Sequence, residues 1–472
     1  MTFSVWGIIP FAVMLIAIAV FPLWPPVAKF WEKRSVQLCF SLILGVPVAI
    51  WLLVGGEAAF VGDKLWEYAQ FIILLFSLFV VSGGIFLAGD IRATPRNNTI
   101  FLAAGSALAS LIGTTGAAML LIRPVLNTNK ERTYKAHTVL YLIFCVANCG
   151  GLLTPLGDPP LFLGLLQGVP FTWTLGLWKE WLFVNGLLLL SYYAIDARYY
   201  ARESVTSVTE DVMEQQPLAL RGSLNFLWLA MIVTAVAAIP SIDMEAIEAG
   251  TADAAHMIPW REIVMLVAAA LSYVTTSRHV RFVDNEYEWG PIGEVAALFI
   301  GIFLTMMPAL KFLAQVAPSL PLNRITFFAF SGSLSSVLDN APTYLTFFEM
   351  AKTLSIPGVP VIAGVPEPYL ISISLGAVLC GALTYIGNGP NFMVKSVADS
   401  RGVTMPSFGG YIGASLTHLL PVLIAMVCVF IAQSHVAHLC GVVVVLGIVG
   451  MAVRNLLAAR SLMDAAHGSS EA

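Results

Sequence analysis

The sequence predicts an all-α polytopic membrane protein with two inverted-topology repeats and extra peripheral helices. Hydrophobic residues make up 58% of its 472 residues and charged residues only 11%, with a mean hydropathy of +0.84. A soluble protein of this length could not keep so much apolar surface from water. Apolar runs of about 20 residues, which cross a bilayer as helices, recur along the chain. A pattern of interrupted apolar segments also occurs twice, which predicts the repeats.

Nine apolar runs have the length and composition of membrane-spanning helices. They cover residues 5–24, 36–54, 67–89, 180–197, 223–241, 258–277, 290–313, 409–432 and 437–453. The first run lacks a basic leading region and a small-residue cleavage site, which favours a retained span over a signal peptide.

Four further segments are apolar but interrupted. Residues 137–168 and 369–398 are broken by Gly and Pro, as in discontinuous helices. Residues 99–126 and 325–350 have polar tips, "LIGTTGAAM" and "SSVLDNAPTYL", and each is long enough for two short helices but not for two spans. We expect re-entrant hairpins, which occur where the backbone is buried in protein or faces a watery cavity. Arg123, beside Pro124, is expected to end the first hairpin.

The Lys and Arg residues predict the orientation. If both hairpins return to the side they entered from, one side collects most of the basic residues. The other side keeps Lys64, Lys179, Arg261, Lys311, Arg324 and Lys352. The basic side is expected in the cytoplasm. In an inner (cytoplasmic) membrane the N-terminus is then outside, the C-terminus is inside, and the first hairpin enters from the cytoplasm.

An internal repeat relates the two halves of the chain. Residues 151–162 align with residues 381–392 at an offset of 230, and Asp158 falls on Asn388. The hairpin tips align at an offset near 226, and three spans align at offsets of 222 to 229. An odd number of crossings separates the repeat starts, so the second copy is inverted. Inverted repeats with paired broken helices predict a secondary transporter whose site lies where the breaks and tips meet.

The predicted organisation has five parts. Residues 1–35 form an extra N-terminal transmembrane helix, and residues 36–197 form the first repeat. Residues 198–257 supply a cytoplasmic linker, a connecting transmembrane helix and the outer acidic loop "SIDMEAIEAGTADAAH". Residues 258–432 form the second repeat, and residues 433–472 form a last transmembrane helix with a cytoplasmic tail.

Candidate ion- and substrate-binding residues lie at the breaks and tips. An ionised carboxylate at membrane depth costs several kcal/mol, so Asp158 and Asp339 are expected to hold Na⁺ or a proton. Nearby hydroxyl and amide oxygens suit a hard cation, whereas the N–H groups at half-helix starts suit an anion. The full candidate set is Thr114, Thr115, Thr154, Gly157, Asp158, Asp339, Asn340, Thr384, Gly387, Asn388 and Asn391.

Purely structural roles are open for the same residues. Asp158 can cap the half-helix that follows, with Pro159 in its first turn. An Asp-Asn pair such as Asp339-Asn340 is also ordinary turn chemistry. Thr within an apolar helix often bonds its own backbone. Asn148, one turn before the first break, is expected to form an interhelical hydrogen bond rather than to bind an ion.

Two motifs resemble those of the ion transporter superfamily, over roughly residues 36–432. "TPLGD" (154–158) is similar to the Thr-x-x-Gly-Asp loop of NhaD-type sodium/proton antiporters and related citrate permeases, and "LDNAP" (338–342) to their Asp-Asn-x-Pro tip. The resemblance implies that Asp158, Asp339 and Asn340 are ion-site residues. The chain departs from the NhaD-type loop at Pro159 and Pro160, where hydroxyl residues are expected. It also lacks the Ser-Asn-Thr tips of the superfamily's dicarboxylate symporters.

Three functions are therefore considered. Na⁺/H⁺ (or Li⁺/H⁺) exchange by alternating access is favoured by the two acidic residues at the expected site. The alternative is Na⁺- or H⁺-coupled symport of citrate or other di- and tricarboxylates, with carboxylates at the half-helix N-termini. An intramembrane aspartyl protease is disfavoured because the chain has no Tyr-Asp motif and a protease gives no reason for an inverted repeat.

The sequence predicts neither an enzyme nor a nucleic-acid-binding protein. It contains no GxxxxGK[ST] and no HExxH motif, so no catalytic residues and no cofactor are expected. The expected partners are the lipid bilayer, Na⁺ and H⁺ as transported or coupling ions, and a small organic anion. The large lipid-facing surface also permits a homodimer.

Overall fold

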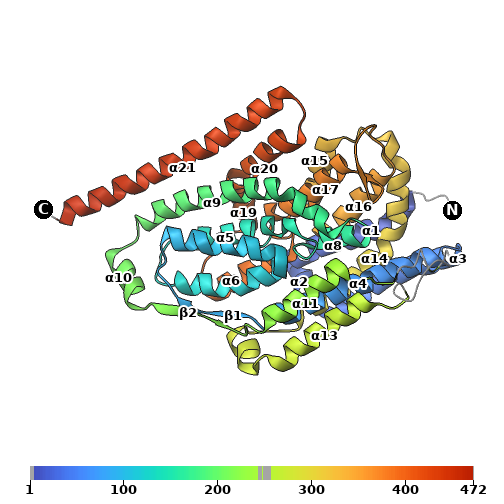
Figure 1. Ribbon diagram of the computed structural model, residues 1–472, viewed down its shortest axis with the longest axis horizontal. Helices are drawn as coiled ribbons and strands as arrows, with labels where there is room; N and C mark the ends of the chain where they lie inside the picture. Colours follow the sequence, from blue (N-terminus) through green and yellow to red (C-terminus); the bar gives the residue numbers. More distant parts are fainter. Residues whose placement is uncertain (1–4, 243–246, 248–256, 471–472) are drawn as a thin grey trace. The chain divides into compact units, whose positions relative to one another are not determined.

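The structure is a computed structural model, and it describes residues 5–242, 247 and 257–470 (Figure 1). These residues form mainly helices, with two short two-stranded sheets. The predicted acidic loop at 241–256 lies almost wholly outside the described residues. The all-α polytopic fold class is confirmed by the apolar helices.

Six of the described helical segments are long and apolar enough to cross a membrane. They are Arg34–Val54, Ala58–Ser82, Ala136–Leu153, Gly290–Ser319, Phe408–Ile431 and His435–Ala465. A seventh span results if the bent pair Val5–Val20 and Pro25–Trp31 counts as one. Three predicted spans, at 180–197, 223–241 and 258–277, are not among them. At the last two places the helices Asn225–Ala238 and Trp260–Thr275 have only 14 and 16 residues, fewer than the roughly 20 that a bilayer requires.

The N-terminal half follows the predicted order of elements. Its helices are α1 (Ile9–Val20), α2 (Pro25–Trp31), α3 (Arg34–Val54), α4 (Ala58–Ser82), α5 (Pro95–Ile112), α6 (Thr114–Thr128), α7 (Ala136–Cys145), α8 (Pro159–Leu166), α9 (Trp178–Tyr200) and α10 (Val205–Met213). The span predicted at 67–89 corresponds to α4, which begins and ends earlier in the sequence, at Ala58 and Ser82. The helix begins earlier because the ion pair Lys64–Glu67 (2.5 Å) neutralises its polar first turns. Residues Phe86–Asp90 form strand β1, which pairs with β2 (Gln216–Arg221).

The C-terminal half contains a second hairpin and a second broken helix. Its helices are α11 (Asn225–Ala238), α13 (Trp260–Thr275), α14 (Gly290–Val316), α15 (Arg324–Ser335), α16 (Asn340–Lys352), α17 (Glu367–Leu379), α18 (Gly389–Ser400), α19 (Phe408–His418), α20 (Leu420–Met426) and α21 (His435–Ser470). A short hairpin, β3 (Val361–Ile362) with β4 (Val365–Pro366), precedes α17. The helix α21 extends well beyond the predicted end at residue 453.

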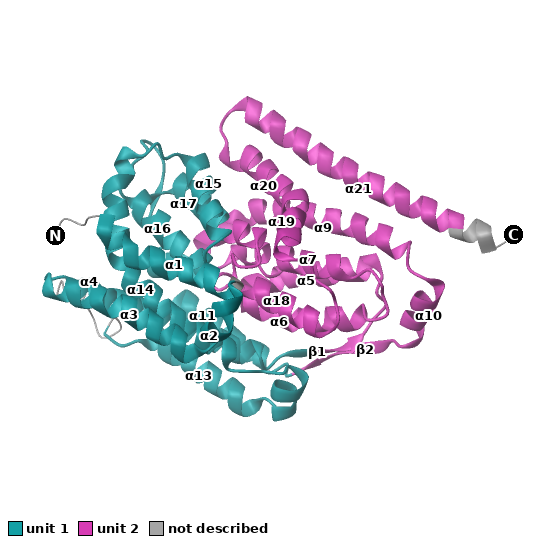
Figure 2. Ribbon diagram, turned by 180° about the vertical axis from the view of Figure 1, so that it is seen from behind, with its two compact units in different colours: residues 1–86, 159–171, 222–377 teal, residues 87–158, 172–221, 378–472 magenta. Residues whose placement is uncertain are grey.

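The chain divides into two compact units (Figure 2). Unit 1 comprises residues 1–86, 159–171 and 222–377. Within it, α14 packs against α3, α4 and α16, and α8 packs against α16. Val48, Leu52, Val61, Leu304 and Met307 form one apolar core cluster of this unit.

Unit 2 comprises residues 87–158, 172–221 and 378–472. It contains the first hairpin, in which α5 and α6 pack side by side (Figure 1). The helix α18 packs on α6, and α9 packs against α5, α7 and α21. The prediction that Arg123 ends the hairpin was wrong, because α6 continues to Thr128 and Arg123 is buried within it.

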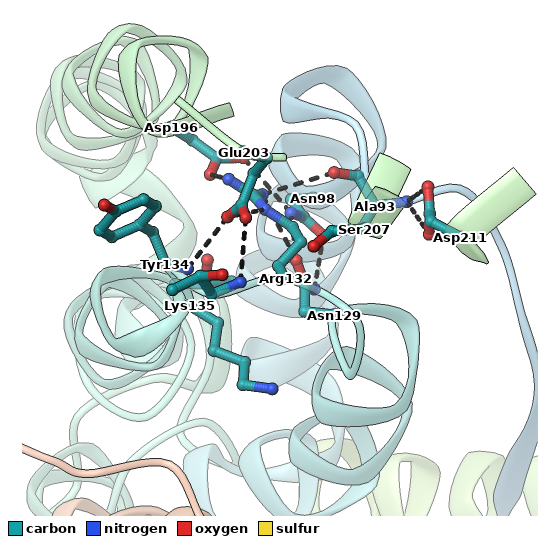
Figure 3. A network of polar contacts seen from close by, with 12 residues as sticks. Ala93, Asn98, Asn129, Arg132, Tyr134, Lys135, Asp196, Glu203, Ser207 and Asp211 are labelled. Atoms are coloured by element: carbon teal, nitrogen blue, oxygen red, sulfur yellow. Dashed lines mark hydrogen bonds and ion pairs between the residues drawn. The ribbon is translucent and has the colours of Figure 1, made fainter. Parts of the chain in front are cut away.

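A buried polar network ties together the ends of α5, α6, α7 and α9 in unit 2 (Figure 3). At its centre Arg132 Nη2 lies 2.7 Å from Asp196 Oδ1, and Arg132 Nε lies 3.5 Å from Glu203 Oε1. His137 Nε2 lies 2.8 Å from the same Asp196 oxygen. Asn98, on α5, donates to Asp196 as well. We call these five residues the Arg132 network.

Candidate functional site

The tip of the first hairpin closes onto the first break. Gly113, with a φ of +82°, separates α5 from α6 and lets the chain reverse. The next residue, Thr114, donates its backbone N–H to the carbonyl of Gly157 (2.8 Å) and its hydroxyl to Asp158 Oδ1 (3.0 Å). Thr114 and Asp158 are 2% and 1% exposed. The predicted meeting of tip and break is therefore present in unit 2.

The two breaks meet each other in the same unit. Asn388 Nδ2 lies 3.4 Å from Asp158 Oδ1 and 3.2 Å from Asn148 Oδ1. Asn148 in turn donates to Asn391 Oδ1 (2.6 Å). The side-chain bond predicted for Asn148 is confirmed, and it joins segments that lie 243 residues apart. Asp158 and its repeat counterpart Asn388 thus share one buried polar cluster, which we call the break cluster: Thr114, Asn148, Asp158, Asn388 and Asn391.

Both breaks have the same local backbone. A 3-10 turn, Cys149–Leu153 in one copy and Cys380–Leu383 in the other, ends at a Thr with extended backbone. Each Thr hydroxyl accepts the N–H two residues further on, at 3.2 Å, in Thr154 and in Thr384 alike. This shared geometry agrees with the internal repeat read from the sequence, while the inverted orientation stays a prediction.

Several candidate residues hold the backbone of the breaks. The Thr154 hydroxyl donates to the carbonyl of Ser110 on α5, so it bonds the backbone of another helix and not that of its own. Asn391 Nδ2 donates to the carbonyls of Gly381 (2.8 Å) and Thr384 (2.9 Å). Gly387, which precedes Asn388 in the sequence, is buried, and Thr115, which follows Thr114, is half-buried.

Asp339 and Asn340 belong to unit 1 and begin the second helix of its hairpin. The Asp339 side chain caps α16 by accepting the N–H of Ala341 (3.2 Å). Asn340 is completely buried. The turn role considered for this pair is therefore present, and it does not conflict with a role in binding, because a capping carboxylate keeps a second oxygen.

Sequence reasoning missed the serines that support the breaks. In unit 2 Ser106 donates to the Cys145 carbonyl (3.1 Å) and Ser110 to the Gly150 carbonyl (2.5 Å). In unit 1 Ser335 donates to the Ala377 carbonyl (2.6 Å). The signal was available, because "SALAS" (106–110) recurs as the spacing of Ser331 and Ser335 in "SGSLS", at an offset of 225.

The break cluster offers ligands for both signs of charge. The Asp158 carboxylate and the Thr114 hydroxyl supply oxygens for a hard cation such as Na⁺. The Asn388 amide and the first N–H groups of α18 suit a carboxylate, since helix N-termini attract anions. The site is closed to solvent at Asp158, which is 1% exposed. Such a site needs movement to open, as alternating access requires.

Gly157→Ala is expected to disrupt the first break. A Cβ on Gly157 would overlap the backbone carbonyl of Gly151, and neither segment can retreat without losing its buried hydrogen bonds. We expect a loss of about 3 kcal/mol in stability, the upper end for overpacking, seen as a lower Tm of the purified protein. Gly389→Ala is the matched control, because a Cβ there meets no atom within 4 Å. Equal Tm values for the two variants would contradict the tight packing of this break.

Comparison of the sequence with known protein families shows which family the chain belongs to. A family model described as "Putative citrate transport" matches residues 1–431. The chain belongs to this family. The matched residues include both breaks, whereas all of α21 lies beyond them. A search of curated proteins returns no match. Membership makes the chain a multi-pass membrane transporter and confirms the expected likeness to citrate permeases; the likeness to NhaD-type antiporters stays a prediction.

Proposed function

We propose that this protein carries citrate, or a related di- or tricarboxylate, across the membrane together with a coupling cation bound at Asp158. The observation that carries the proposal is the break cluster, in which Asp158 and the amide of Asn388 share one buried site. Membership of the citrate-transport family supports the organic anion as cargo.

Electrostatics gives the reason for coupling. A buried carboxylate at Asp158 repels a polyanion strongly, because charges interact far more at low dielectric than in water. A Na⁺ ion or a proton at Asp158 removes that repulsion, so the anion binds well only after the cation. The amide N–H groups of Asn388 and the start of α18 then face the carboxylate groups of the substrate.

Transport in proteoliposomes tests this proposal. The purified protein is reconstituted with an internal pH dye, and uptake of labelled citrate is followed under an imposed inward Na⁺ gradient or proton gradient. We expect uptake to rise at least tenfold with one of the two gradients and to be unaffected by the other. Succinate as competitor reports whether dicarboxylates share the site. The absence of citrate and succinate uptake under both gradients would overturn the proposal.

Na⁺/H⁺ exchange is the second candidate function. It is favoured by the carboxylate of Asp158, whose Oδ1 accepts hydrogen bonds from a neutral hydroxyl and a neutral amide. Na⁺ and a proton can compete for such a group, and that competition suffices for exchange. In the same liposomes, proton efflux evoked by Na⁺ or Li⁺ without any carboxylate would favour this function over symport.

We also propose the orientation read from the basic residues. The two repeats, residues 36–197 and 258–432, would enter the cytoplasmic membrane in opposite directions, with the N-terminus outside and the C-terminus inside. Support comes from the repeated element order of hairpin and broken helix in both halves. Cysteine labelling at Arg460→Cys, on the tail side of α21, is expected only with a reagent that reaches the cytoplasm.

A further inference from the structure

A basic pocket lies in unit 2, away from the break cluster, where α21 packs along α9. It has a volume of about 400 Å³, and three arginines line it: Arg198 on α9, Arg202 in the turn that follows α9, and Arg454 on α21. Arg198 Nη1 donates to Asn455 (3.1 Å), while its Nε is buried without a hydrogen-bond partner among the described residues. Arg202 and Arg454 are exposed. We call this feature the arginine pocket.

The positive charge of the arginine pocket is not neutralised by the carboxylates of its own helix. Asp196 on α9 and Glu203 just after α9 are the acidic residues nearest to Arg198 in the sequence, and both lie against Arg132. Three guanidinium groups that share a pocket repel one another unless an anion lies between them. Guanidinium groups bind phosphate oxygens in bidentate fashion, so a phosphate suits this pocket.

An apolar pocket of about 130 Å³ adjoins the arginine pocket. Four residues line both pockets: Ile195, His418, Met451 and Asn455. Ile448 and Ala452 extend the apolar part along α21. The same helix exposes a row of large apolar side chains, among them Leu439, Val443 and Leu446. A ligand that fills both pockets must have an anionic head and an apolar tail.

The positions of Arg198 and Arg454 along their helices support the same ligand. Arg454 comes 19 residues after the start of α21, a rise of about 29 Å, and Arg198 comes 20 residues after the start of α9, a rise of about 30 Å. The hydrocarbon core of a bilayer is about 30 Å thick. With the start of each helix at one surface of the bilayer, both arginines would reach the headgroup level of the opposite leaflet.

We propose that the arginine pocket binds an anionic phospholipid, with its phosphate among Arg198, Arg202 and Arg454 and an acyl chain against Ile448 and Met451. Basic pockets between transmembrane helices are a known means of recognising such headgroups. The lipid would fasten α21, which lies wholly beyond the residues shared with the citrate-transport family, to α9. The site is independent of the transported substrate.

Native mass spectrometry of the delipidated, full-length protein tests the proposal. Phosphatidylglycerol is expected to bind at least tenfold more tightly than phosphatidylcholine. Arg454→Gln should weaken phosphatidylglycerol binding about fivefold, and Arg198→Gln/Arg454→Gln about 30-fold. Arg454 is exposed, so its single variant keeps the packing and remains informative if the double variant misfolds. Arg460→Gln, two turns further along α21, is the matched control and should bind as wild type.

Two further arms separate a lipid from a free anion. Ala452→Phe fills the apolar pocket and should weaken phosphatidylglycerol binding without changing the affinity for glycerol phosphate. Citrate at millimolar concentration should not displace the lipid. Equal binding of both lipids, full binding by Arg454→Gln, equal affinity for glycerol phosphate and phosphatidylglycerol, or displacement by citrate would each overturn the proposal.

Discussion

Asp158→Asn is expected to reduce coupled transport by at least about 100-fold while the protein keeps its fold and its Tm. The loss of a charged ligand from a buried site costs about 3 kcal/mol, which corresponds to roughly 100-fold in affinity for the cation. The fold should survive because Asn caps a helix N-terminus about as well as Asp does. The amide also still accepts the hydroxyl hydrogen bond of Thr114, now 3.0 Å from Asp158 Oδ1. Initial rates of citrate uptake and of Na⁺-evoked proton movement measure the effect.

The repeat provides a control for this variant. In Asp158→Asn/Asn388→Asp the carboxylate and the amide exchange places within one contact of 3.4 Å. We expect the double variant to recover part of the transport lost in the single variant, since the cluster again holds one negative charge. If Asp158 only caps α8, the single variant should transport at the wild-type rate, and that result would remove Asp158 from the binding site.

The features that follow from local chain chemistry could be predicted from the sequence. Gly and Pro around "TPLGDPP" and "YIGNGPN" interrupt the helices because they break the backbone hydrogen-bond ladder, and both breaks are present. The polar tip "GTTG" predicts a hairpin because Gly113 adopts a positive φ. The repeat offset of 230 aligns Asp158 with Asn388, and these two side chains lie 3.4 Å apart.

Features that depend on tertiary partners could not be predicted. The start of α4 at Ala58 depends on the ion pair between Lys64 and Glu67, in which the two charges neutralise each other. A hydropathy scale counts each of these residues as unfavourable in a membrane span. Arg123 reads as an interfacial residue, yet it lies buried within α6. The serines of α5 recur at the repeat offset, but nothing local shows that the partner of Ser110 is the backbone at Gly150.

The Arg132 network illustrates the same limit and leads to the largest expected effect on stability. Arg132 lies far from Asp196 and Glu203 in the sequence, and the side chains of all three are at most 2% exposed (Figure 3). Burial alone lowers the pKa of the Arg132 guanidinium, but the nearby Asp196 and Glu203 outweigh it and raise this pKa overall. The guanidinium therefore stays charged, and it is the main compensation for two buried carboxylates.

Arg132→Gln is expected to destabilise the protein by about 3–5 kcal/mol, because breaking a buried ion pair leaves charges without compensation. Urea or thermal unfolding of the purified protein measures the loss. Lys130→Gln is the matched control: its ammonium group also contacts carboxylates, at 3.1 Å from Asp90 and 2.8 Å from Glu214, but its side chain is 42% exposed. Exposed pairs contribute at most about 1 kcal/mol, so this variant should stay close to wild type.

A double-mutant cycle separates charge compensation from packing in this network. Asp196→Asn removes a buried carboxylate that Arg132 Nη2 contacts at 2.7 Å. If charge is the cause, Arg132→Gln/Asp196→Asn should lose less stability than the sum of the two single variants, with a coupling of about 1–3 kcal/mol. Strict additivity would assign the effect to packing.

Because Asn98 and Asn129 join the Arg132 network to both helices of the first hairpin, loss of the network should also loosen the hairpin that positions Thr114 against Asp158. Transport should then fall along with stability, in contrast to Asp158→Asn, which should lose transport alone.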